Sequence, residues 1–307
     1  MTANVEKMAL IGEPSWHGLE HVMPLNSSLD EWYQHSGLKF NVVKSPVRYR
    51  LGDGVEMTSD DHCVLYRDDT YQDLSVVGSK YKVVQPKKIL YFFEDFIKSH
   101  QCVMETAGSL DGGRKVWALA RTGDAFYATK NDEVREYLLL ATSYDTSMRT
   151  ICKHTAIRVV CQNTLGASLR EKGKAITVSH RSEFDETEIK LDMGLLLKEW
   201  NQFKYNVIDM ARIQIDIKYA SSWYATFLGI EKQDDIDCSR MHAQLMDCFS
   251  NGKGASSSLW GVLNGVTAWV DHVRGRNPDN RVNSAWFGTG AALKDKAMKQ
   301  AMESISG

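Results

Sequence analysis

The sequence has few of the features that mark membrane, secreted or fibrous proteins. Only five of its 307 residues are proline, and no apolar run approaches the about 18 residues that a membrane-spanning helix needs. Its six cysteines include no C-x-x-C pair, which argues against a zinc ribbon or a disulfide framework. Residues 1–7 are polar and acidic, unlike a signal peptide. We therefore expect a cytoplasmic protein with free, buried thiols and no membrane contact.

Motifs for nucleotide hydrolysis and for catalysis are also lacking. The phosphate-binding pattern G-x-x-x-x-G-K-[ST] does not occur, and nothing marks an oxyanion hole or the third residue of a catalytic triad. The zinc-protease pattern H-x-x-E-H does occur from His17 to His21, but Gly18 and the flanking prolines Pro14 and Pro24 disfavour the helix that it needs. We therefore predict no catalytic residue, no metal site and no cofactor.

The composition is that of an ordinary globular protein, with 43% hydrophobic and 25% charged residues. The first half reads as strands separated by turns, and Asp111-Gly112-Gly113 joins two of them as a hairpin turn would. A helix starting at Pro86 carries an aromatic stripe that we expect to be core. The candidate strands are 38–50, 62–67, 74–84, 102–107, 115–121 and 137–144.

The second half changes to helical periodicity, with candidate helices at 184–217, 219–230, 238–251, 259–274 and 289–305. The fourth follows a cap at Ser256-Ser257-Ser258. The predicted fold is therefore α+β: a curled antiparallel sheet with crossing helices, then a helical half. We expect a β-rich core with a basic helix in residues 1–181 and a helical region packed on it in residues 182–307.

The net charge of -2 hides a basic segment in the middle of the chain. Residues 147–181 contain a single acid, Glu171. Such a segment indicates either a polyanion site or a solvated face whose cations pair with acidic helices, and both readings stay open here. Its basic residues are Arg149, Lys153, Arg158, Arg170, Lys172, Lys174 and Arg181.

The stretch from Thr155 to Glu171 has the spacing of a helix. Arg158, Gln162 and Arg170 then share one face, where their donors could hold a phosphate backbone. The alternatives are a helix whose arginines pair with acids, or a strand over residues 157–160.

A second basic cluster lies near the carboxyl end. It includes Arg281 and Lys294, and Trp286 beside them could stack on a base. Gly288-Thr289-Gly290 opens a predicted helix whose free N–H groups could bind an anion. Tyr144 is a second candidate for stacking. The predicted nucleic-acid-binding residues are Arg149, Lys153, Arg158, Gln162, Arg170, Lys172, Lys174, Arg181, Arg281 and Lys294.

Three stretches carry a resemblance to a known family: residues 16–19 (W-H-G-L), 157–165 (I-R-V-V-C-Q-N-T-L) and 285–294 (A-W-F-G-T-G-A-A-L-K). They resemble a phage- and plasmid-encoded family catalogued as a domain of unknown function and often labelled "phage/plasmid-like protein". More distantly, a curled sheet with a basic helix looks like the single-strand annealing proteins of phages, the Red-beta and Erf superfamily. That second similarity implies ATP-independent annealing by an oligomeric ring or filament.

The resulting hypothesis is a nucleic-acid-binding protein of a phage or plasmid. It would bind single-stranded DNA, form homo-oligomers and promote strand annealing in recombination without a chemical step. Two alternatives stay open. One is a host-interaction or anti-defence protein that uses acidic surfaces, and the other is a metal-dependent nuclease or peptidase.

Overall fold

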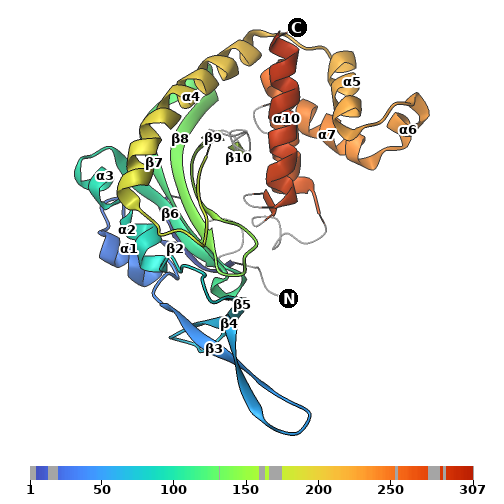
Figure 1. Ribbon diagram of the computed structural model, residues 1–307. Helices are drawn as coiled ribbons and strands as arrows, with labels where there is room; N and C mark the ends of the chain where they lie inside the picture. The colour runs from blue at the N-terminus through green and yellow to red at the C-terminus, as the bar shows by residue number, and fades with distance from the viewer. Residues whose placement is uncertain are drawn as a thin grey trace. The chain divides into compact units, whose positions relative to one another are not determined.

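The computed structural model describes residues 5–12, 20–130, 132–158, 163–165, 175–252, 255–275, 284–285 and 288–306. The fold is α+β, as predicted, with most strands in the first half of the chain and most helices in the second (Figure 1). Within these ranges, no helix combines the length and the apolar character needed to cross a membrane.

The strands form two sheets. They are β1 (Val5–Leu10), β2 (Glu20–Val22), β3 (Val42–Arg50), β4 (Glu56–Arg67), β5 (Asp73–Gly78), β6 (Cys102–Leu110), β7 (Lys115–Thr129), β8 (Asp132–Ser143), β9 (Thr150–Arg158), β10 (Asn163–Leu165) and β11 (Ile176–Val178). The larger sheet has the order β10-β9-β8-β7-β6-β1-β2, with β11 also paired to β9, and the smaller one has the order β3-β4-β5. The pair β1 and β2 is parallel, whereas β1–β6, β6–β7, β3–β4 and β4–β5 are antiparallel.

The helices lie around and after the strands. They are α1 (Leu29–His35), α2 (Pro86–Tyr91), α3 (Glu94–Lys98), the short 3-10 turn η1 (Asp111–Gly113), α4 (Glu186–Arg212), α5 (Ile217–Leu228), α6 (Gln233–Cys238), α7 (Arg240–Asn251), α8 (Leu259–Ala268), the π-helical turn η2 (Trp269–Val273) and α10 (Thr289–Ser306). The predicted helix after Pro86 is divided into α2 and α3. Its stripe is core as expected, because Ile89, Phe92 and Phe93 are fully buried.

The chain divides into two compact units. Unit 1 comprises residues 1–122, 138–153 and 176–192, and unit 2 comprises residues 123–137, 154–175 and 193–307. The strands β7, β8 and β9 and the helix α4 each run from one unit into the other. Both units are therefore discontinuous in sequence, and the boundary expected between residues 181 and 182 stays a prediction.

The hairpin between β6 and β7 forms where the sequence places it. Leu110 pairs with Lys115, and the turn between them contains three successive residues with positive φ: Asp111 at 54°, Gly112 at 68° and Gly113 at 90°. Glycine adopts this left-handed backbone at little cost. The turn prediction is therefore confirmed.

The predicted basic helix from Thr155 is wrong at every described position. Residues up to Arg158 continue β9, and Asn163–Leu165 form β10, which pairs back onto β9 in antiparallel register. The β-branched residues Thr155 and Ile157 favour a pleated strand over a helix, and pairing with neighbouring strands outweighs the helical spacing of the arginines.

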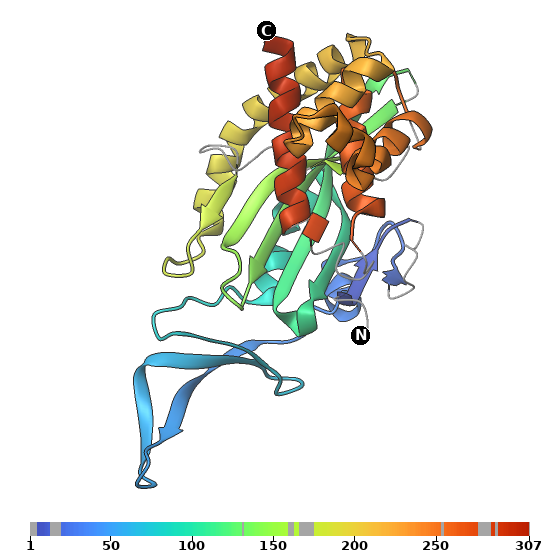
Figure 2. The same cartoon turned by 90° about the vertical axis from the view of Figure 1, so that its right-hand side faces the viewer.

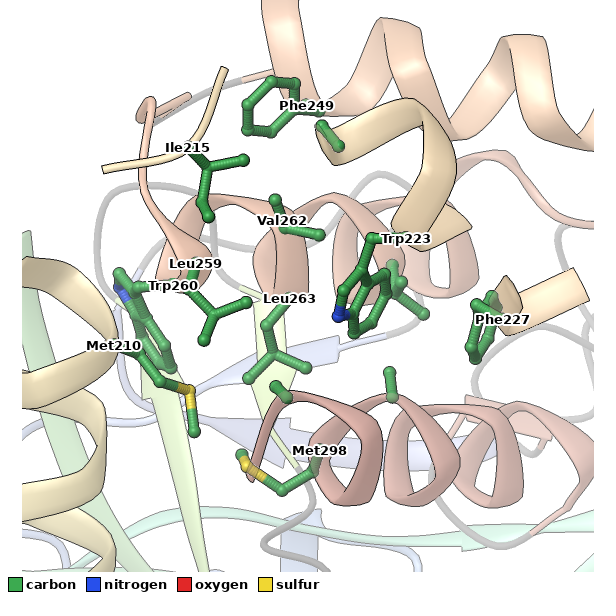
Figure 3. Packing of buried hydrophobic residues seen from close by; sticks show 14 of the residues in the cluster. Met210, Ile215, Trp223, Phe227, Phe249, Leu259, Trp260, Val262, Leu263 and Met298 are labelled. Carbon is green, nitrogen blue, oxygen red and sulfur yellow. The ribbon is translucent and has the colours of Figure 1, made fainter. Parts of the chain in front are cut away.

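The core of unit 2 is built around α8, which is buried on all sides. Ser258 caps its first turn by accepting a hydrogen bond from the N–H of Gly261 at 3.1 Å, so the predicted serine cap is confirmed. Trp260 donates from its indole to Asp132 at 2.7 Å, and Tyr224 on α5 donates to the Val262 carbonyl at 2.8 Å. Figure 3 shows the apolar side chains of α4, α5, α7, α8 and α10 that pack here.

In unit 1, one buried arginine joins three separated segments. Arg67, at the end of β4, is 5% exposed and forms ion pairs with Glu6 of β1 at 2.5 Å and Asp69 at 2.7 Å. Its guanidinium also donates to the Gly112 carbonyl at 3.3 Å and lies 4.1 Å from the centre of the Phe40 ring. The planar fork of arginine can satisfy two carboxylates and stack at once, which lysine cannot do.

Replacing Arg67 by methionine should destabilise the fold strongly. The substitution leaves Glu6 and Asp69 without their shared cation, but both side chains are about one third exposed, so we expect the free energy of unfolding to fall by about 2 kcal/mol. Urea denaturation measures this. Arg50→Met is the matched control, because Arg50 pairs with Glu56 while both side chains are more than 60% exposed. Equal stability of the two variants would contradict the role given to Arg67.

Candidate nucleic-acid interface

The predicted basic segment is described only in part. Arg149 and Arg181 are exposed, Lys153 is half-buried on β9, and Arg158 is the last residue of β9. The remaining predicted positions lie outside the described residues: Gln162, Arg170, Lys172, Lys174, Arg281 and Trp286.

Strand pairing brings Arg149 and Arg181 to the same end of the sheet. In the antiparallel pair β9–β11, Thr150 lies opposite Val178 and Cys152 opposite Ile176. Arg149 directly precedes β9, and Arg181 follows β11 by three residues. Arg149 and Arg181, which are 32 positions apart in the sequence, therefore lie near each other at one end of the sheet in unit 1.

His180 fastens this end of the sheet to the loop after β5. Its Nε2 lies 2.9 Å from the Met148 carbonyl, and since a carbonyl only accepts, Nε2 carries the proton. The imidazole stacks on the ring of Tyr81, with centroids 4.5 Å apart and planes 18° apart. Tyr81 in turn donates from its hydroxyl to the Ser143 carbonyl at 2.6 Å. The loop is thus held by stacking and by hydrogen bonds together.

The stacked loop adds lysines to the two arginines. Lys80 and Lys82 flank Tyr81 and are exposed. Lys44 of β3 reaches the same loop, where its Nζ donates to the carbonyls of Tyr81 and, at 3.3 Å, Ser79. We call this set the cationic cluster: Lys44, Lys80, Lys82, Arg149 and Arg181.

Carboxylates also lie near these cations, among them Glu183 and Asp145. Glu183 pairs with Lys82 at 2.6 Å, and the hydrogen bond from that lysine lowers the pKa of Glu183. Burial acts to raise the pKa of Asp145, but hydrogen bonds from Ser147 and the charge of Lys115 outweigh it, so the pKa is lowered. Both acids are therefore ionised at neutral pH and offset part of the charge of the cluster.

Two of the predicted contact residues take structural roles instead. Tyr144 was predicted to stack on a base, but its ring is fully buried in unit 1 and its hydroxyl donates to the Val84 carbonyl at 2.8 Å. Burial raises the pKa of Tyr144 far above its usual value. Lys294 was predicted to contact phosphate, but it is 2% exposed in unit 2 and its Nζ lies 2.6 Å from Asp271.

Lys294 belongs to a helix-packing motif that the sequence suggested as an anion site. A Cβ at Gly290 would lie 2.8 Å from the Ser284 carbonyl and 2.9 Å from a methyl group of Val270, so only glycine fits there. The N–H of Gly290 already donates to the Ser284 hydroxyl at 3.1 Å. The motif G-T-G-A-A-L-K therefore lets α10 approach η2 closely and buries the pair of Lys294 and Asp271.

Sequence reasoning missed three members of the cationic cluster. Lys44, Lys80 and Lys82 lie in the acidic first half of the chain, and a charge count along the sequence hides them. The local run S-K-Y-K at residues 79–82 was the available signal, since it interleaves cations with an aromatic residue. Their proximity to Arg149 depends on tertiary contacts, which no window of sequence reveals.

The H-x-x-E-H pattern does not form the helix that zinc proteases use. Glu20 and His21 are adjacent residues of strand β2, and the His21 ring stacks on His35 at 3.9 Å. Across the described part of the chain, no group of three or more histidine, cysteine, aspartate or glutamate side chains is placed to hold a metal ion. His17 and Gly18 lie outside the described residues.

Comparison with known proteins places the chain in a family. The family described as "Domain of unknown function (DUF932)" matches residues 73–286, more than half of the chain. The chain belongs to the DUF932 family. No curated protein and no solved structure matches. Membership of a family of unknown function is thereby confirmed, while a phage or plasmid origin and the likeness to annealing proteins stay predictions. The match starts at the first residue of β5, so Lys44 precedes it and the other four members of the cationic cluster fall within it.

Lys294→Met should destabilise unit 2. The methionine leaves the carboxylate of Asp271, only 9% exposed, without its cation, so we expect a loss of about 3 kcal/mol in the free energy of unfolding. Lys299→Met, at an exposed position of the same helix, should change little. Thermal and urea unfolding measure the stability of both variants. Adding Asp271→Leu to Lys294→Met removes the unpaired carboxylate and should restore part of the lost free energy of unfolding. If the two lysine variants were equally stable, Lys294 would not have the structural role assigned here.

The stack of His180 on Tyr81 should loosen in acid. Burial lowers the pKa of His180, against the hydrogen bond to Met148 and the charge of Asp145, so the folded protein binds this proton more weakly than the unfolded chain. The contribution of neutral His180 is therefore complete above the unfolded pKa of about 6.5 and declines as the pH falls below it.

We expect the free energy of unfolding to decrease between pH 7 and pH 5 more steeply in the natural protein than in His180→Phe, which keeps the stacked ring. The difference should stay under about 1 kcal/mol per pH unit, since the ring is partly exposed and solvent screens its charge. Parallel slopes for the two proteins would show that His180 does not titrate in this range.

Proposed function

We propose that the protein binds nucleic acid through the cationic cluster, and that the ligand is single-stranded DNA. One observation carries the proposal: cations from four separate segments of unit 1 meet where β9, β11 and the loop after β5 are joined. Cations gathered from distant parts of a sequence repel one another, so their convergence favours a ligand that supplies negative charge.

The competing explanation is that these cations only neutralise nearby acids. Lys82 does pair with Glu183, but both side chains are about half exposed or more, and such a pair exchanges readily with an anionic ligand. Arg149 and Arg181 form no ion pair within the described part of the chain. Their forked donors are exposed and suited to phosphate oxygens.

The finer parts of the proposal draw on the resemblance to phage annealing proteins. Annealing needs a surface that screens the repulsion between two backbones while the bases stay accessible, and it needs no catalytic side chain and no ATP. The sequence offers no phosphate-binding loop, which agrees with such an activity. We propose strand annealing in recombination on this basis.

A host-interaction protein without nucleic-acid activity is the alternative from another class. The acidic stretches at residues 182–192 and 231–237 are the surfaces that it would use, and in the second stretch Asp234, Asp235 and Asp237 on α6 are exposed. Affinity capture from nuclease-treated bacterial lysate separates the two proposals. A stoichiometric protein partner, together with no retention of oligonucleotides by the purified chain, would favour this alternative.

Binding of a fluorescent single-stranded oligonucleotide should depend strongly on salt. If the five cations each neutralise one phosphate, the slope of log affinity against log salt should be roughly -3.5, and Arg149→Gln with Arg181→Gln should bring it to roughly -2. Fluorescence anisotropy between about 50 and 200 mM salt measures both slopes. Duplex DNA and RNA of the same sequence, run in parallel, determine the strand preference.

The matched control is Lys7→Gln with Lys39→Gln. It makes the same change in net charge at two exposed lysines of unit 1 that lie outside the cluster, and it should leave the slope near that of the natural protein. A flat salt response, or an equal decrease in both double variants, would refute the proposed site.

A further inference from the structure

The segment that joins β11 to α4 lies against the cationic cluster and carries an acid. Figure 2 shows this segment, residues 179–185, as a yellow loop that leads into α4. The backbone N–H of Lys82 donates to the His180 carbonyl at 2.5 Å, and the side chains of Lys82 and Glu183 are paired at 2.6 Å. A backbone contact, and not charge alone, therefore places this acid beside the cluster.

A second lysine, which is not part of the cluster defined above, acts on the same carboxylate. Lys88 is exposed on α2, six residues after Lys82. The hydrogen bond and the charge of Lys82 lower the pKa of Glu183, and the charge of Lys88 lowers it further. The carboxylate thus lies in the field of two lysines from two elements, the loop after β5 and α2.

The backbone around this carboxylate is held on both sides. Phe184 packs edge-on against Phe92, a fully buried residue at the end of α2, with ring centroids 6.3 Å apart. The side chain of Gln85, at the start of α2, forms two hydrogen bonds of 2.9 Å with the backbone of Val42. The two lysines therefore keep their backbone positions whether or not the carboxylate stays beside them.

The fold does not need the carboxylate of Glu183. Its side chain is 78% exposed and that of Lys82 is 49% exposed, so the pair adds little stability. The carboxylate does not cap α4 either, because Asp185 already accepts hydrogen bonds from the N–H groups of Thr187 and Glu188, at 2.9 and 3.2 Å. It can therefore leave the lysine at little cost.

We propose that Lys82 and Lys88 form a phosphate subsite, which Glu183 occupies in the free protein and leaves when nucleic acid binds. A carboxylate oxygen offers an ammonium group the same charged acceptor as a phosphodiester oxygen does. A strand can displace it because other phosphates of the strand engage Arg149 and Arg181 at the same time. The inference rests on the proposed function, and it adds a lysine and a built-in competitor to that site.

Removal of the competitor should strengthen binding. An exposed ion pair is weak, so Glu183→Gln should raise the affinity for a fluorescent single-stranded oligonucleotide by about 1.5- to 5-fold. Glu188→Gln is the matched control, since it makes the same change in charge at an exposed acid of α4 that pairs with no cation among the described residues. It measures the general effect of removing a negative charge, which should be smaller.

Loss of the second lysine should weaken binding. If Lys88 contacts a phosphate, Lys88→Gln should lower the affinity about five-fold in about 100 mM salt. Lys87→Gln is its matched control, because Lys87 is also exposed on α2 but its ammonium lies over two rings, 5.7 Å from the centre of Tyr33 and 4.9 Å from that of Tyr91. The control should change the affinity less than Lys88→Gln does.

The effect of the acid should depend on the lysines. In a variant with both Lys82→Gln and Lys88→Gln, adding Glu183→Gln should raise the affinity no more than Glu188→Gln does, because no lysine is left for the carboxylate to occupy. Fluorescence anisotropy measures every affinity, and circular dichroism verifies that each variant is folded.

The outcomes distinguish a wrong subsite from a wrong function. If the natural protein binds the oligonucleotide with the expected salt dependence, but Glu183→Gln or Lys88→Gln matches its control, the subsite is refuted and the proposed function stands. An effect of Glu183→Gln that persists without the two lysines refutes the subsite in the same way. If neither the natural protein nor the Glu183 variant binds, the proposed function and the subsite both fall.

Discussion

The stack of Tyr81 on His180 is the contact on which the candidate interface depends. It joins the loop after β5 to the strand pair β9–β11, and the hydrogen bond from His180 to the Met148 carbonyl fixes the imidazole against the segment that precedes β9. Together with the hydrogen bond from the Tyr81 hydroxyl to the Ser143 carbonyl, this stack keeps Lys80 and Lys82 beside Arg149 and Arg181. The stacked rings of Tyr81 and His180 thus help to bring cations from separate segments onto one surface. This is also why a change in the protonation of a single imidazole should be felt there.

Burial decides which cations of this protein can serve a ligand. Arg67 and Lys294 are buried and held by carboxylates of their own units, so their charges stabilise the fold within unit 1 and within unit 2 and are not available to a solvent-borne anion. Arg149 and Arg181 have the same chemistry but are exposed. A sequence lists these four residues as equals. The difference between the buried and the exposed cations is desolvation. A charge can be removed from water only where a fixed partner of opposite charge replaces the water.

Much of the fold is local and could be predicted. The turn at Asp111-Gly112-Gly113, the serine cap of α8 and the helical second half each follow from a few neighbouring residues, whose backbone preferences act in the unfolded chain as well. The segment from Thr155 could not be assigned from its spacing, because its conformation is set by pairing with strands that are distant in sequence. The cationic cluster has the same origin. Two of the predicted contact residues, Tyr144 and Lys294, proved to be structural. Their polar groups are buried because each has a partner inside the fold, the Val84 carbonyl for Tyr144 and the Asp271 carboxylate for Lys294. The spacing of residues along the sequence cannot identify such partners.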